Sequence, residues 1–149
     1  MKNLLFLLVL VFVGVSVHAQ QSQNYDNTIE LQTSQGFDEA FRTIGRHLVS
    51  NGLTIEDANK DFGTITTKGV RIGNRMDPVW EMKITAMITD EGQNPSKIIL
   101  TAMVRNADKS WERLNKRGSL HMFGKGWTVL ETIAYEYKDA AITFKREAE

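Results

Sequence analysis

Apolar and polar residues alternate most regularly in two neighbouring segments of the chain. In residues 80–89 (WEMKITAMIT) and 97–105 (KIILTAMVR) every second residue is apolar, which is the pattern of a β-strand with one buried face. The turn-forming sequence DEGQNPS separates the two segments. We therefore expect the two segments to form an antiparallel hairpin.

The same alternation predicts the register of this hairpin. A register that sets Ile88 opposite Ile98 brings the alternating apolar residues of both strands to one face. It also sets Glu81 opposite Arg105, and opposite charges in facing positions stabilise one alignment. Because a slip of one residue exchanges the two faces, the register decides which side chains are buried.

The reverse face of the two strands is the candidate binding surface, and we call it the open sheet face. It is rich in threonine and carries two methionines and an isoleucine near its middle. Its residues are Lys83, Thr85, Met87, Ile99, Thr101 and Met103. Methionine suits adaptable contact surfaces because its side chain is flexible and polarisable. The alternative is a solvated sheet face with scattered apolar residues, as most proteins have.

Residues 34–52 show a helical period instead. Four apolar residues fall at spacings of four, three and four, which places them on one side of a helix. They are Phe37, Phe41, Ile44 and Leu48. Ser34 is the expected N-cap, and Gly52 is expected to end the helix in the left-handed conformation.

The end of the chain has the same kind of period. Apolar residues recur there at spacings of three and four, at Trp127, Leu130, Ala134, Tyr137, Ala141 and Phe144. This pattern predicts a long final helix that runs to about residue 144. Before it, residues 106–126 are polar and rich in glycine, so we expect a long loop with a short helical turn.

Residues 57–69 (DANKDFGTITTKG) place two glycines around a threonine cluster and a lysine, as a phosphate-binding loop does. Such a loop has the spacing GxxxxGK[ST] and opens a helix. The β-branched residues between Gly63 and Gly69 favour a strand. We therefore interpret the stretch as part of a β-hairpin and not as a nucleotide site.

With a further short strand at residues 28–32 (TIELQ), the predicted elements follow the order β-α-β-β-β-β-α. Hairpins and amphipathic helices each have an apolar face to bury. The predicted fold class is therefore α+β, an antiparallel sheet with two helices packed on one face. We expect one domain at residues 28–149, after a flexible N-terminus at residues 20–27.

The first 19 residues have the pattern of a signal peptide. One lysine precedes an uncharged apolar run at residues 4–17, which is shorter than the roughly 18 residues that a membrane-spanning helix needs. Val17 and Ala19 suit the small-residue positions of a cleavage site, so we expect cleavage after Ala19. This predicts an exported protein, periplasmic or secreted, with no transmembrane segment in the mature chain.

Composition excludes several function classes. The chain has no cysteine, which excludes disulfides, thiolate nucleophiles, cysteine-ligated zinc and a lipid anchor attached through cysteine. Removal of Lys2 with the signal peptide leaves 17 of the 18 basic residues against 18 acidic ones. Such a balance argues against nucleic acid as a partner, because phosphate binding requires a basic surface.

The sequence NGLTIEDANKDFGTITTKG, together with the predicted order of elements, resembles small exported domains of the TBP-like class. It is similar to the domains of the C lipoprotein of the outer-membrane β-barrel assembly machine, and to secreted families of unknown function, over roughly residues 28–145. The lipobox cysteine of that lipoprotein is missing here. The resemblance implies a non-catalytic interaction module of the cell envelope and assigns no site residues.

Catalytic and metal-binding patterns are weak. His47 lies beside the apolar stripe of the first helix, and His121 lies in a glycine-containing loop that also fits an anion. Neither belongs to a zinc-binding spacing. The acid pairs at residues 38–39 and 90–91 suit a helix start and a turn better than glycoside hydrolysis, and no serine lies in a GxSxG motif. We expect no cofactor, no metal and no enzymatic activity.

The predicted function is a non-catalytic exported interaction module of the cell envelope. It binds an envelope protein, or another copy of itself, through the open sheet face. The alternative is a small apolar-ligand carrier of helix-grip type, in which the final helix encloses a ligand against a curved sheet. A hydrolase is the third hypothesis. If the open sheet face is not the site, the next contact set is Trp111, Arg113 and Lys125 in the 106–126 loop.

Overall fold

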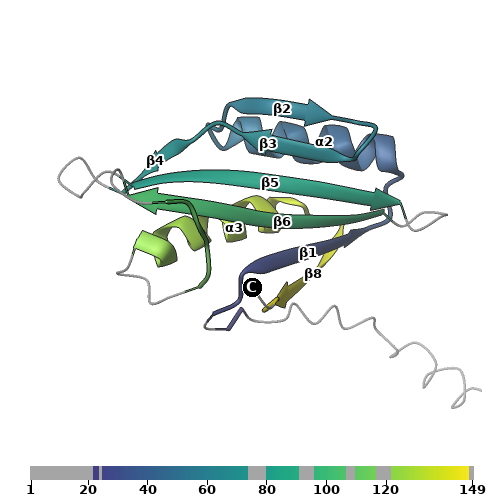
Figure 1. Ribbon diagram of the computed structural model, residues 1–149. Helices are drawn as coiled ribbons and strands as arrows, with labels where there is room; N and C mark the ends of the chain where they lie inside the picture. Colours follow the sequence, from purple (N-terminus) through teal and green to yellow (C-terminus); the bar gives the residue numbers. More distant parts are fainter. Residues whose placement is uncertain are drawn as a thin grey trace, which may run out of the picture.

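The structure is a computed structural model. It describes residues 22–23, 25–73, 80–90, 96–106, 110–116 and 122–147. The signal peptide expected at residues 1–19 lies outside the described residues. An antiparallel sheet and two helices make up the described part of the chain, which confirms the α+β fold class (Figure 1).

The sheet has eight strands, more than the five that the sequence predicted. The strands are β1 (Thr28–Thr33), β2 (Ile55–Asn59), β3 (Thr64–Thr67), β4 (Val70–Ile72), β5 (Trp80–Asp90), β6 (Ser96–Asn106), β7 (Glu112–Arg113) and β8 (Ala140–Lys145). Six of them follow the order β2-β3-β5-β6-β1-β8, while β4 pairs with β5 and β7 pairs with β6. Three strands were not predicted. They are β4 and β7, from residues that the sequence pattern placed at the end of a strand and in loops, and β8, from residues that it placed in the final helix.

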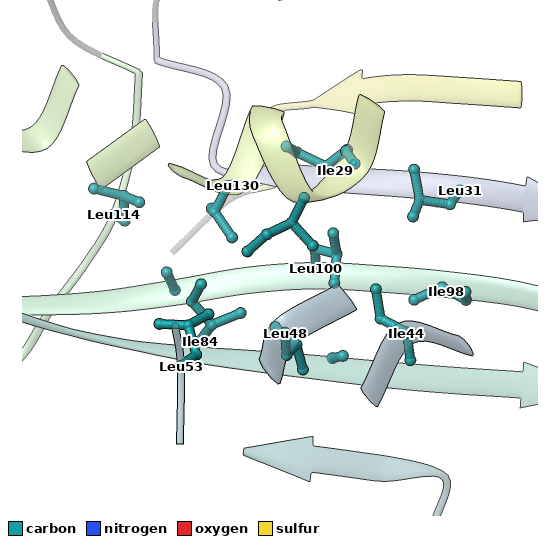
Figure 2. Close-up of a cluster of buried hydrophobic side chains, with 14 of the residues drawn as sticks. Ile29, Leu31, Ile44, Leu48, Leu53, Ile84, Ile98, Leu100, Leu114 and Leu130 are labelled. Carbon is teal, nitrogen blue, oxygen red and sulfur yellow. The ribbon is translucent and has the colours of Figure 1, made fainter. Parts of the chain in front are cut away.

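The helices are α2 (Phe37–Ser50) and α3 (Met122–Glu136). Both lie on the same side of the sheet, α2 beside the β2–β3 hairpin and α3 across β6 and β1 (Figure 1). The core fills the space between the helices and the sheet. In Figure 2, Ile44 and Leu48 of α2 and Leu130 of α3 point toward sheet residues such as Leu100, and all four side chains are fully buried.

The register of the central hairpin is confirmed. Strands β5 and β6 pair over eleven positions, with Ile88 opposite Ile98 and Glu81 opposite Arg105. The Arg105 guanidinium donates to Glu81 Oε2 over 2.8 Å and 3.0 Å. The alternation therefore identified the buried and the outward-facing side chains of both strands correctly.

The stretch at residues 57–69 is also a hairpin, as the sequence predicted. Strands β2 and β3 pair antiparallel, and the turn between them ends at Gly63. Gly63 has a φ of +64°, and a Cβ atom there would lie 2.2 Å from the backbone oxygen of Ile88. Only glycine fits this position. The turn cannot move away to make room, because the Ile88 amide donates to the Gly63 carbonyl over 2.7 Å and holds the turn against β5.

Helix α2 ends as predicted but begins differently. Gly52 has a φ of +79°, and the amides of Gly52 and Leu53 donate to the carbonyls of Val49 and Leu48, the pattern that ends many helices with a left-handed glycine. The N-cap is Gly36, so the prediction of Ser34 was wrong. The chain is still leaving β1 at that point, because Thr33 Oγ1 accepts a hydrogen bond from the Gln35 amide.

The prediction of a final helix to residue 144 was wrong at both ends. Helix α3 begins earlier, at Met122, and ends at Glu136. Residues 140–145 form β8, which pairs with β1 and sets Ile142 opposite Leu31 and Phe144 opposite Ile29. Without β8, strand β1 would expose a row of unpaired backbone groups at the sheet edge. Phe144 is buried as the helical period suggested, but from a strand.

Candidate functional site

The structure brings the six predicted residues of the open sheet face together on β5 and β6. They form three facing pairs, Lys83 with Met103, Thr85 with Thr101, and Met87 with Ile99. The alternating burial of both strands places them on the side of the sheet away from the two helices. Met87 and Met103 are each 38 % exposed, and the other four are half-buried.

Neighbouring strands extend this surface with further polar residues. On β3, Thr64 lies opposite Met87 and Thr66 lies opposite Thr85. On β1, Glu30 lies opposite Ile99. The middle of the open sheet face is therefore a mixture of threonine methyl and hydroxyl groups with two methionine side chains.

Trp111 covers one end of the open sheet face. Its ring centroid lies 4.6 Å from the Arg105 guanidinium carbon and 5.7 Å from Lys83 Nζ, within the range of cation–π attraction. Arg113, on β7, donates to Thr28 Oγ1 and to Glu147 Oε2. Two residues of the alternative contact set thus make internal contacts, and the third, Lys125, lies on α3.

Ion pairs satisfy the charges around the open sheet face. Lys83 Nζ lies 2.7 Å from Glu56 Oε2, and Lys145 Nζ lies 2.8 Å from Glu30 Oε2. Together with the Glu81–Arg105 pair, these contacts occupy the periphery of the face. The part left for an external partner is the weakly polar middle around Met87 and Met103.

A second feature, which the sequence analysis missed, is an apolar groove between α2 and the β2–β3 hairpin. We call it the α2 groove, and its volume is about 510 Å³. One wall comes from α2 and the other from the hairpin. The lining residues are Phe41, Arg42, Gly45, Arg46, Val49, Ser50, Ile55, Ala58 and Ile65.

Two small residues, Gly45 and Ala58, line the α2 groove. A Cβ atom on Gly45 would meet only Ile65 Cδ1, at an ordinary contact distance of 3.5 Å. Ala58 lies opposite Ile65 because the pairing of β2 and β3 shifts by one residue between Ile55 and Asp57. This bulge brings Ile55 and Ala58 to the same wall. The only sequence signal was a glycine four residues from both Phe41 and Val49 on the helix.

His47 joins the two helices. Its Nδ1 lies 3.5 Å from Glu136 Oε2, and its ring centroid lies 5.5 Å from that of Tyr137. The side chain of Asn51 donates to the same Glu136 carboxylate over 2.7 Å. His47 is therefore a residue at the rim of the core, where it contacts the end of α3. His121, the other histidine considered, lies outside the described residues.

Asp38, of the first acid pair, lies 3.0 Å from Lys60. Burial raises the pKa of Tyr137, while the hydroxyls of Thr33 and Thr43 act in the opposite direction. Burial also raises the pKa of Tyr135. Among the described residues, no three His, Asp or Glu side chains lie close enough together to hold a metal ion.

No protein-family model matches the chain, and no curated protein matches it either. In the part of the chain that the structure describes, no helix is long and apolar enough to cross a membrane.

Proposed function

We propose that this protein is a non-catalytic interaction module of the cell envelope that binds a protein partner through the open sheet face. The partner is an envelope protein or a second copy of the chain. The observation that carries the proposal is the weakly polar middle of β5 and β6, where Met87 and Met103 are each 38 % exposed. Flexible methionine side chains can adapt to the shape of a partner.

The arrangement of charges supports a contact surface of this kind. Around the face, Lys83 and Arg105 are already paired with carboxylates of the same chain. A partner that covers the middle therefore has no uncompensated charge to bury, which would be costly. The threonines beside the methionines have methyl groups for packing and hydroxyls that can bond to a partner or to water.

A non-catalytic role agrees with the placement of the described histidine. His47 belongs to α2 and contacts Tyr137, whereas the threonine hydroxyls of the open sheet face lie on the other side of the sheet. An activated hydroxyl nucleophile needs a base within hydrogen-bond reach. His47 is therefore not positioned to activate Thr85 or Thr101.

We further propose a TBP-like topology and export of the mature chain. The succession of β1, α2, the β2–β3 hairpin, the β5–β6 hairpin and α3, with both helices on one side of the sheet, supports the resemblance to exported TBP-like domains, while β4, β7 and β8 are additional to the predicted order. The apolar run at residues 4–17 supports export. The signature of that assembly-machine lipoprotein is incomplete, since the chain has no cysteine.

The carrier hypothesis of helix-grip type receives less support. Such a carrier needs space between the final helix and the sheet, and Leu130, Ile133 and Ala134 of α3 are fully buried there. The ligand-sized hollow described above lies beside α2 instead. An apolar ligand would therefore bind on the other helix.

The proposal is tested by capturing partners from the native cell envelope with three forms of the tagged protein. These are the wild type, the double variant Met87→Lys with Met103→Lys, and the control Phe62→Lys. Phe62 is 76 % exposed in the turn between β2 and β3, so the control adds a lysine at an exposed apolar position away from the open sheet face and from the α2 groove. All three are expected to fold, because substitutions at exposed positions usually change stability by about 0.5 kcal/mol or less.

A protein recovered with the wild type and the control, and lost with the double variant, supports the open sheet face as the site. Sedimentation of the purified forms tests self-association in the same way. Equal recovery of the partner protein with all three forms would contradict the proposal. Unfolding of the double variant by several kcal/mol would also contradict it, since that result means that the methionines are covered.

A further inference from the structure

We propose that the α2 groove binds an anionic amphiphile, with an apolar chain between α2 and the β2–β3 hairpin and an acidic head group on Arg42 and Arg46. This inference does not rest on the proposed function, because the groove lies in the helix layer and the open sheet face lies on the other side of the sheet. The groove volume of about 510 Å³ falls within the roughly 300–1,000 Å³ typical of small-molecule sites.

The first argument concerns charge. Many cationic side chains of the described residues lie within 4 Å of a carboxylate, among them Lys60, Lys83, Arg105, Arg113, Lys116 and Lys145. Arg42 and Arg46 differ. Arg42 Nε donates to the backbone oxygen of Asp38, and an Arg46 nitrogen donates to Thr43 Oγ1, each over 3.2 Å.

Both arginines line the groove beside its apolar wall. Like charges four residues apart on a helix repel each other, so an anion shared between Arg42 and Arg46 would relieve this repulsion. The guanidinium fork suits a carboxylate or a phosphate, to which it can donate two hydrogen bonds. Glu39 lies beside both arginines, but its carboxylate is not among their bonded partners within the described residues.

The second argument concerns the residues that hollow the groove. Glycine inside a helix is less stable than alanine by about 1 kcal/mol, and close packing does not require it at position 45, where an added Cβ would make an ordinary contact. Gly45 and Ala58 face each other across Ile65 and keep the space between the two walls open. A hollow maintained against helix propensity is expected where a ligand occupies it.

The geometry of β2 favours an amphiphile over an extended peptide. A peptide strand would have to pair with the outer edge of β2 to satisfy its backbone groups. The pairing of β2 is interrupted by the bulge after Ile55, and Glu56 and Asp57 are exposed there. Bulges and charged side chains are the features that discourage strand addition. An alkyl chain has no backbone groups to satisfy.

The direct test is calorimetric titration with dodecanoate below its micelle concentration, supported by backbone amide NMR. Dodecanoate is expected to bind with shifts confined to α2, β2 and β3, and dodecyltrimethylammonium, which has the same chain and the opposite charge, is expected to bind much more weakly. Phosphatidylglycerol vesicles distinguish a lipid head group from a free acid as the source of the anion. Binding of either anionic probe supports the site.

Three variants locate the binding. Gly45→Leu fills the groove and is expected to abolish binding without lowering the thermal midpoint; Ala58→Leu fills it from the other wall in case the first variant misfolds. Arg42→Gln with Arg46→Gln is expected to weaken dodecanoate binding about tenfold or more. The matched control is Lys145→Gln with Arg146→Gln, which removes the same charge from β8 and its end, at the opposite edge of the sheet. Its affinity should equal that of the wild type.

Three results would overturn the inference. The first is that neither dodecanoate nor the anionic vesicles bind to the wild type. Binding of an acidic apolar peptide alone would count as this result. The second is unchanged affinity in both leucine variants. The third is equal binding of the cationic and anionic probes. The variant with Met87→Lys and Met103→Lys should still bind dodecanoate, so failure of the groove and failure of the open sheet face are separate outcomes.

Discussion

Gly45 of α2 and Gly126 of α3 have opposite surroundings. A Cβ atom on Gly126 of α3 would lie 3.1 Å from Leu114 Cδ1, 3.3 Å from Met82 Sδ and 3.4 Å from Ile72 Cδ1. A Cβ atom on Gly45 of α2 would meet only Ile65 Cδ1, at 3.5 Å. The same residue type therefore allows close packing in one helix and leaves a hollow beside the other.

The difference shows that the two helices cover the sheet in different ways. Helix α3 is closely packed against the sheet, since Gly126, Trp127, Leu130 and Ile133 are all buried. The buried residues of α2 lie on one side, while Phe41 is half-buried and Val49 is 56 % exposed beside the groove. Glycine content alone does not separate these cases. The neighbours that the fold supplies decide whether a glycine is a packing requirement or an open space.

The largest expected effect comes from removing a large side chain from the closely packed contact between α3 and the sheet. Trp127 is 1 % exposed, packs against Phe144 and donates from Nε1 to Ser22 Oγ. Trp127→Ala should lower the free energy of unfolding by about 3–5 kcal/mol. Phe41→Ala, from the groove wall, should cost about 1 kcal/mol because that side chain is half-buried. Denaturant unfolding measures both, and equal losses would contradict the comparison.

The same substitution at the two glycines sharpens the comparison further. Gly126→Leu should destabilise the protein by about 1–3 kcal/mol, because three buried side chains surround the position. Gly45→Leu should change the free energy of unfolding by about 0.5 kcal/mol or less, or raise it, because the new side chain enters the groove. Thermal and denaturant unfolding of the two variants side by side checks this. A loss of similar size at Gly45 would show that the groove is closed.

A smaller effect is expected from Gly45→Ala. The methyl group has room beside Ile65 Cδ1, and alanine loses less backbone entropy on folding than glycine does. The free energy of unfolding should therefore rise by about 0.5–1 kcal/mol. Denaturant midpoints at constant slope measure the change, and a lower midpoint would mean that the position is strained or crowded.

The smallest effect concerns pH at the junction of the two helices. Burial raises the pKa of Tyr137 above its ordinary value of 10.0, and its hydroxyl donates to Gln35 Oε1. The folded state thus favours the neutral phenol. The resulting stability is fully present below pH 10 and is lost as the pH rises through the raised folded-state pKa.

Unfolding of the wild type and of Tyr137→Phe at several pH values from 8 upward tests this linkage. Phenylalanine cannot ionise, so the decline of stability with rising pH should be shallower in the variant. Parallel curves for the two proteins would show that Tyr137 does not contribute to the alkaline decline.

The sequence alone determined the elements whose pattern depends on near neighbours. The central hairpin, its register and the six residues of the open sheet face follow from a period of two, because successive side chains of a strand point to opposite faces. The end of α2 at Gly52 follows from the low cost of positive φ for glycine. The hairpin at residues 57–69 follows from its β-branched threonines and isoleucine.

Only the tertiary structure decided the features that depend on distant partners. Residues 140–145 carry a helical spacing, yet they form β8 because β1 offers an unpaired edge more than a hundred residues earlier in the chain. Gly126 lies inside α3 because Leu114, Met82 and Ile72 need its space. The α2 groove exists because a bulge in β2 turns Ala58 toward Ile65 across from Gly45. Periodicity reports which residues must be buried, whereas the partner that buries them is settled by packing and by backbone hydrogen bonds across the whole fold.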